Sequence, residues 1–132
     1  MKSILLAGSL MIILFGACNK DPVNLDFINV RGTVIAKETC NTNETTDYWL
    51  IDLTLNPDTP QYGSTVTING AIFTDVVKTK ELSPQLKELG KHVFFHFQEI
   101  SDNPVETLNC NVSTPVTYLV KEIYILEQGE AL

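Results

Sequence analysis

Apolar and polar residues alternate along most of the chain after residue 26, and this period of two constrains the fold more than any other sequence feature. Successive side chains of a β-strand point to opposite faces, so the alternation predicts strands with one face toward a core. The expected strands are 27–38, 47–55, 65–68, 71–79, 91–99 and 117–127. The sequence therefore predicts a mainly β protein.

Two short motifs interrupt the alternation. Asn69-Gly70 separates two predicted strands and is typical of a type I′ hairpin turn, because both turn residues need a positive φ. Ser83-Pro84 is typical of a helix start, and Gly90 of a helix end. We expect a helix of one to two turns between them, with Leu86 and Leu89 facing the core.

Length and composition indicate a single packed domain. The chain has 132 residues, of which 44% are hydrophobic and 19% charged, so a core can form and wholesale disorder is excluded. Nine basic and sixteen acidic residues give a formal net charge of −7. Proteins that bind nucleic acid or anionic lipid through charge need a basic stripe or cluster. We therefore expect no nucleic-acid partner.

The first 17 residues have the layout of a signal peptide. Lys2 is followed by an apolar run over 4–15 and then by the small residues Gly16-Ala17. About 16 uncharged residues stand between Lys2 and Asn19, whereas a transmembrane helix needs about 20 apolar residues. The segment 1–17 therefore predicts export from the cytoplasm rather than a lasting membrane span.

The five residues LFGAC, which end at Cys18, resemble the lipobox of bacterial lipoproteins. The resemblance implies that the Cys18 thiol carries diacylglycerol, that the signal is cut before Cys18, and that the new amine is acylated. An ordinary secretory signal with an incidental cysteine is the alternative. Residues 18–26 would then form a lipidated tether, and 27–132 the folded domain.

Lys20-Asp21 follows the lipobox and resembles the surface-export signal of Bacteroidetes-type lipoproteins. The implied location is the outer membrane of a bacterial cell envelope, with the lipid as anchor. Both the periplasmic leaflet and the cell surface stay open as the side on which the domain lies.

Cys40 and Cys110 are the two cysteines left after Cys18. Both lie in polar stretches, ETCNTNETT and LNCNVSTP, and thiols of small exported domains usually pair. The sequence therefore predicts a disulfide between them, with two free thiols as the alternative. A metal site is disfavoured, because there is no CxxC motif and no histidine close to either cysteine in the sequence.

The predicted order is three strands, a short helix and two strands, with an inserted hairpin. This order resembles the OB-fold, a five-stranded barrel with its helix between strands three and four. The segment ELSPQLKELGK, followed by an aromatic strand, is also similar to small OB-like lipoproteins of Bacteroidetes-type envelopes. A β-sandwich or a β-meander is the competing architecture.

Few residues suggest chemistry. His92 and His96 are four apart on a predicted strand, which separates them by about 13 Å and excludes shared zinc coordination. The carboxylates of 99–106 could hold calcium weakly, but the EF-hand spacing is absent, and a solvated acidic loop is favoured. No nucleophile elbow or phosphate-binding loop occurs. We expect neither a cofactor nor catalysis.

Aromatic side chains offer a candidate binding face instead. The alternation points Tyr48 and Phe94 outward from strands 47–55 and 91–99, together with His92 and His96. Aromatic rings on an exposed sheet face can anchor a protein or glycan partner. The sequence thus predicts a membrane-tethered, non-catalytic envelope lipoprotein that binds a protein, peptide or glycan. The alternative is a small inhibitor of a hydrolase such as lysozyme, because an acidic domain would be steered to a basic enzyme.

Cys18→Ala tests the lipobox. Because the thiol is the acylation point, labelled palmitate should enter the unsubstituted protein and not the variant. Gel autoradiography of the envelope fraction measures both. Equal labelling of the two proteins would contradict lipidation at Cys18.

Overall fold

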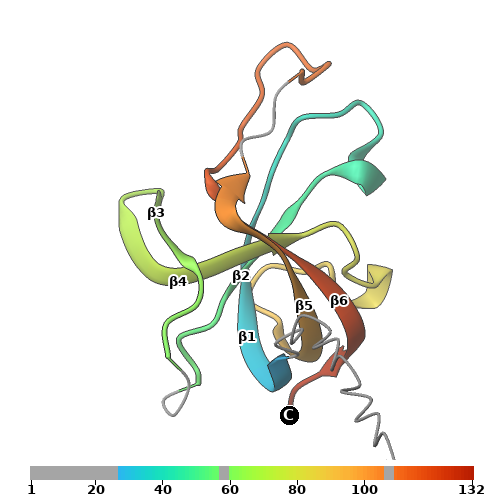
Figure 1. Ribbon diagram of the computed structural model, residues 1–132. Helices are drawn as coiled ribbons and strands as arrows, with labels where there is room; N and C mark the ends of the chain where they lie inside the picture. The colour runs from blue at the N-terminus through green and yellow to red at the C-terminus, as the bar shows by residue number, and fades with distance from the viewer. Residues whose placement is uncertain (1–26, 57–59, 106–108) are drawn as a thin grey trace, which may run out of the picture.

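The computed structural model describes residues 27–56, 60–105 and 109–132 (Figure 1). The predicted signal peptide 1–17 and the predicted tether 18–26 with Cys18 lie outside the described residues. The chain forms one sheet and two short 3₁₀ helices, η1 (Glu44–Thr46) and η2 (Pro84–Leu86). The six strands are β1 (Phe27–Lys37), β2 (Trp49–Asp52), β3 (Ser64–Ile68), β4 (Ala71–Thr79), β5 (His92–Val105) and β6 (Val120–Glu130). The prediction of a mainly β protein is confirmed.

Four of the six strands have two neighbours each, and β4 has three. The strand order is β2-β1-β5-β6-β4-β3, and β2 also pairs with β4, so the pairings β1-β2-β4-β6-β5 return to β1. The β4–β6 pair is parallel, with Val77 opposite Lys121, and the other pairs are antiparallel. Within the described ranges, β3 pairs with β4 alone.

The expected helix between strands three and four is wrong in place and length. β3 and β4 are joined by Asn69-Gly70, whose φ angles of 50° and 83° are both positive, as a type I′ turn requires. The segment 83–90 lies between β4 and β5 and forms only η2. Five residues between Pro84 and Gly90 are too few for a stable α-helix. Leu86 is buried as predicted, but Leu89 is exposed.

The last two strands end later than their sequence patterns indicate. β5 continues to Val105, and its pairing with β6 resumes at Pro104 after a register shift that begins at Glu99. β6 runs to Glu130, and the Ala131 N–H donates to the His92 carbonyl at 3.0 Å. Hydrogen bonding to β5 therefore continues to Ala131.

The buried apolar side chains form two clusters, because β2 is covered on both faces. Trp49 and Ile51 belong to the first cluster, whereas Leu50 between them belongs to the second. A register shift between Val34 and Ala36 places these two residues in different clusters, although the alternation predicts one face. The second cluster also takes side chains from the β3–β4 hairpin, the β6 start and the segment before it: Val66, Ile68, Phe73, Val76, Tyr118 and Val120.

Gly32 lies just before the β1–β2 pairing begins at Thr33. Gly32→Ala tests how closely the backbone of β1 packs against β2 at this position. A Cβ there would lie 2.4 Å from Ile51 Cγ2 and 3.0 Å from the Asp52 carbonyl oxygen. Overpacking of this kind costs about 1–3 kcal/mol of unfolding free energy, measurable by urea titration of the oxidised protein. Exposed Thr67→Ala is the control and should change the free energy by less than about 0.5 kcal/mol. Equal stability of both variants would contradict the close contact.

Candidate functional site

The predicted binding face is only partly assembled. His92, Phe94 and His96 lie on the outer side of β5, because Val93, Phe95 and Phe97 between and beyond them are fully buried. Phe94 is 39% exposed. Three of the four predicted residues therefore share one surface.

Tyr48 is not on that surface, and its predicted exposure is wrong. The side chain is 7% exposed, with Lys78 Nζ 4.7 Å and Lys80 Nζ 4.6 Å from the ring centroid. Burial, and then the charge of nearby Glu122, raise the pKa of the Tyr48 hydroxyl well above its usual value. Alternation in sequence cannot reveal this burial, because the side chains that cover this side of β2 come from distant segments.

The two histidines are held by neighbours on β1 and β6. His92 Nδ1 lies 3.1 Å from Thr33 Oγ1. His96 Nδ1 accepts from the backbone N–H of Asn29 at 3.2 Å, and its Nε2 lies 3.3 Å from a Glu127 carboxylate oxygen. Across the described ranges, no three His, Cys, Asp or Glu side chains gather as a possible metal site. Most of the acidic segment 99–106 lies outside the residues whose side chains are described.

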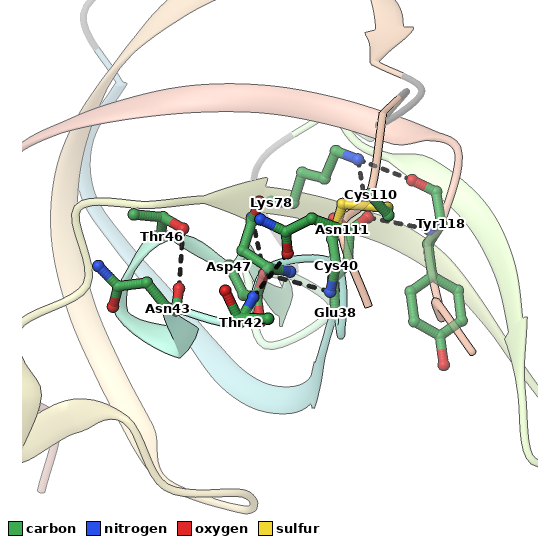
Figure 2. Close-up of a disulfide and its surroundings, with 11 residues drawn as sticks. Glu38, Cys40, Thr42, Asn43, Thr46, Asp47, Lys78, Cys110, Asn111 and Tyr118 are labelled. Atoms are coloured by element: carbon green, nitrogen blue, oxygen red, sulfur yellow. Dashed lines mark hydrogen bonds and ion pairs between the residues drawn. A yellow bond between two sulfur atoms is a disulfide. The ribbon is translucent and has the colours of Figure 1, made fainter. Parts of the chain in front are cut away.

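The predicted disulfide between Cys40 and Cys110 is present, with the two Cα atoms 4.5 Å apart (Figure 2). Cys40 follows β1, and Cys110 precedes β6. The bond therefore joins the loop 38–48 to the segment 109–119, which we call together the loop pair. Figure 1 shows the two loops side by side at the end of the molecule where β1 finishes.

Backbone hydrogen bonds hold the two loops together beside the disulfide. Thr39 and Val116 form an isolated antiparallel bridge, with N···O distances of 2.9 and 2.8 Å. The Cys40 carbonyl accepts from the Asn111 N–H at 2.9 Å, and the Asn111 side chain accepts from the Thr42 N–H at 2.7 Å. The contacts make one unit of two loops that are about 70 residues apart in the sequence.

Side-chain oxygens shape the first loop from within. The buried Asp47 carboxylate accepts from the backbone N–H groups of Cys40 and Asn41, at 3.2 and 2.9 Å. Asn43 caps η1, and its side-chain oxygen accepts from the Thr45 N–H at 3.2 Å. Asn and Asp favour such local bonds to the backbone, which is why this polar stretch folds into a defined loop.

A buried ion pair supports the base of the second loop. Glu38 Oε1 and Lys78 Nζ lie 2.8 Å apart, and both side chains are fully buried (Figure 2). Glu38 Oε1 also accepts from the Tyr118 N–H, and Lys78 Nζ donates to the Tyr118 carbonyl, both at 2.9 Å. The pair thus binds both backbone groups of Tyr118, near the end of the second loop and just before β6.

The exposed surface of the loop pair is largely uncharged and mostly polar, with Val116 and Leu119 as its exposed large apolar side chains. Its exposed charged residue within the described ranges is Glu44, which pairs with Lys37 at 2.8 Å. The other exposed polar residues supply hydroxyl and amide groups, which can donate and accept hydrogen bonds. They are Thr39, Thr42, Asn43, Thr45, Thr46, Asn109, Asn111, Ser113 and Thr114. The sequence patterns did not predict a binding surface on these loops. The predicted Cys40–Cys110 disulfide was the one sequence signal that the two loops lie together.

Lys78→Ala tests the support of the loop pair. The substitution removes the charge that neutralises the buried Glu38 carboxylate, and breaking a buried pair from one side costs about 3–5 kcal/mol. Lys91→Ala is the matched control, because its Glu88 partner is largely exposed and the pair contributes less than about 1 kcal/mol. Urea unfolding of both variants measures the difference. Similar losses of stability would contradict a special role for the buried pair.

Within the described ranges, no helix is long and apolar enough to cross a membrane. No protein-family model, curated protein or solved structure matches the chain.

Proposed function

We propose that this chain is an exported, lipid-anchored domain of the bacterial envelope that acts by binding and not by catalysis. One observation carries the binding proposal: two loops distant in sequence are held as one rigid unit, with an exposed surface of hydrogen-bonding groups. A loop surface that is ordered before binding loses less conformational entropy on contact with a partner. Such loops on a rigid scaffold are common sites of recognition.

The finer fold proposed for the domain is an OB-like barrel. The closed series of pairings β1-β2-β4-β6-β5, the parallel β4–β6 pair and the short turn η2 before β5 all support it. β3 is then an insertion that pairs with β4. In OB-folds, the loops after the first strand and before the last strand bind ligands, and these positions correspond to the loop pair.

Strand β1 supports an orientation relative to the membrane. It spans Phe27–Lys37, or roughly 35 Å if extended, and the loop pair follows its far end (Figure 1). A lipid at Cys18 would be attached on the side of Phe27. The loop pair would then point away from the membrane to which the domain is anchored, and toward a partner in the surrounding space.

The surface chemistry favours a protein, peptide or glycan as the partner. Hydroxyl and amide groups match the hydrogen-bonding groups of peptide backbones and sugars. The net charge of −7 disfavours nucleic acid. The hydrolase inhibitor is the second candidate, because the loop pair projects from the sheet with Glu44 exposed, although Lys37 neutralises that carboxylate. Inhibition of a purified lysozyme in a turnover assay distinguishes the two.

Thr42→Arg combined with Ser113→Arg tests the loop pair. Both side chains are exposed, one on each loop, so two arginines there should block contact and leave the fold intact. Loss of one interface hot spot costs about 2 kcal/mol or more, roughly thirtyfold in affinity. Quantitative capture of the partner from envelope extract, with thermal unfolding of each protein, measures the effect.

The matched control is Thr65→Arg with Thr74→Arg, which adds the same charge at exposed positions of the β3–β4 hairpin. The control variant should capture the same amount of partner as the unsubstituted protein does. Equal capture by both double variants would exclude the loop pair as the contact surface. Hydrolytic activity of the purified protein would contradict a purely binding role.

A further inference from the structure

A second polar site lies near the opposite end of β1 from the loop pair. Asn29, Arg31 and Phe94 line an open groove of about 460 Å³, together with residues 130–132. Binding sites for small molecules have volumes of about 300–1,000 Å³. The groove is therefore large enough for a compact ligand.

Arg31 is the only arginine of the chain, and its backbone is fixed. The Asn56 side chain accepts from the Arg31 N–H at 2.9 Å and donates to the Arg31 carbonyl. The β1–β2 pairing begins only at Thr33, so the two Asn56 bonds satisfy the backbone groups of Arg31 on the edge of β1 that faces β2. The exposed Arg31 side chain therefore extends from a backbone position that Asn56 fixes.

The charged side chains that line the groove belong to Arg31 and Glu130. Among the described residues, Arg31 forms no ion pair within 4.0 Å, whereas the Glu130 carboxylate in the same groove pairs with Lys91 at 3.7 Å. A guanidinium that no described residue pairs with can bind one carboxylate, because its planar fork matches the two oxygens through two hydrogen bonds. A phosphate dianion would need further cations.

An aromatic residue of β5 lies opposite Arg31 in the sheet. Phe94 is the direct partner of Arg31 across the β1–β5 pair, and of Gly129 across the β5–β6 pair. A Cβ at Gly129 would lie 2.5 Å from Phe94 Cε1, so the ring rests closely on the backbone of β6. Because Gly129 has no side chain, the partly exposed Phe94 ring can lie against the β6 backbone at this position. The groove thus combines a cation with an apolar wall.

We propose that this groove binds a small monocarboxylate with an apolar body. The carboxylate accepts hydrogen bonds from the Arg31 guanidinium, and the apolar body packs on the Phe94 ring. The site is separate from the loop pair, so the proposal stands or falls independently of the proposed partner binding.

N-acetyl-phenylalanine is the probe, and N-acetyl-phenylalaninamide, which lacks the carboxylate, is its control. In a two-dimensional NMR titration of the exported protein, the acid should shift the amide signals of Arg31, Phe94 and Ala131 with affinity in the millimolar range. The amide probe should bind about tenfold more weakly or worse, because it loses charge-assisted hydrogen bonds.

Three variants sharpen the test. Arg31→Gln should weaken binding of the acid about tenfold or more, and Arg31→Lys by an intermediate factor, because lysine keeps the charge but loses the fork. Lys87→Gln also removes one positive charge, but Lys87 does not line the groove, so affinity should be unchanged.

Any of four outcomes would overturn the proposal. These are equal affinity for acid and amide, unchanged affinity in a folded Arg31→Gln variant, tighter binding of inorganic phosphate, or no shift of these signals at about 10 mM acid. Failure here would leave capture through the loop pair unaffected.

Discussion

The buried Glu38–Lys78 ion pair is the contact on which the arrangement around it depends. Removing two charges from water costs several kcal/mol for each ion, and only close pairing with further hydrogen bonds offsets that cost. Here both groups also bind the backbone of Tyr118. Three segments must therefore meet at one point: the end of β1, the end of β4 and the chain that enters β6. That meeting places the second loop beside the first, where Cys40 and Cys110 can bond.

The closed series of strand pairings decides which surfaces remain for function. β2 is covered on both faces and Tyr48 just before it is buried, so the aromatic face expected on strand 47–55 does not form. The outer side of β5 stays exposed because β1 and β6 flank it without covering it. The proposed contact surface and the Arg31 groove therefore lie toward different ends of β1. A tethered domain with this arrangement could hold one partner at its outer end while a small ligand occupies the other site.

Local patterns predicted the parts of the fold that local forces control. The Asn69-Gly70 turn, the presence of six strands and the outward side chains of His92, Phe94 and His96 follow from turn chemistry and alternation, and the structure confirms them, although the ends of β2, β5 and β6 differ from the predicted bounds. The prediction of a longer helix over 83–90 is wrong because too few residues lie between Pro84 and Gly90. The predicted exposure of Tyr48 is wrong because its burial depends on segments that are distant in sequence. The loop pair was not selected as a site because its surface arises from two loops that only the disulfide and the ion pair bring together.

The sequence by itself determined the β class, the hairpin turn and the identity of the paired cysteines, because alternation, turn residues and thiol chemistry act over a few residues or by elimination. Only the tertiary structure decided which side of β2 is buried, which loops meet, and that Arg31 lies beside Phe94. These features depend on strand register and on which strands become neighbours. A one-residue register shift changes the face of every following side chain, and in β1 such a shift separates Val34 from Ala36.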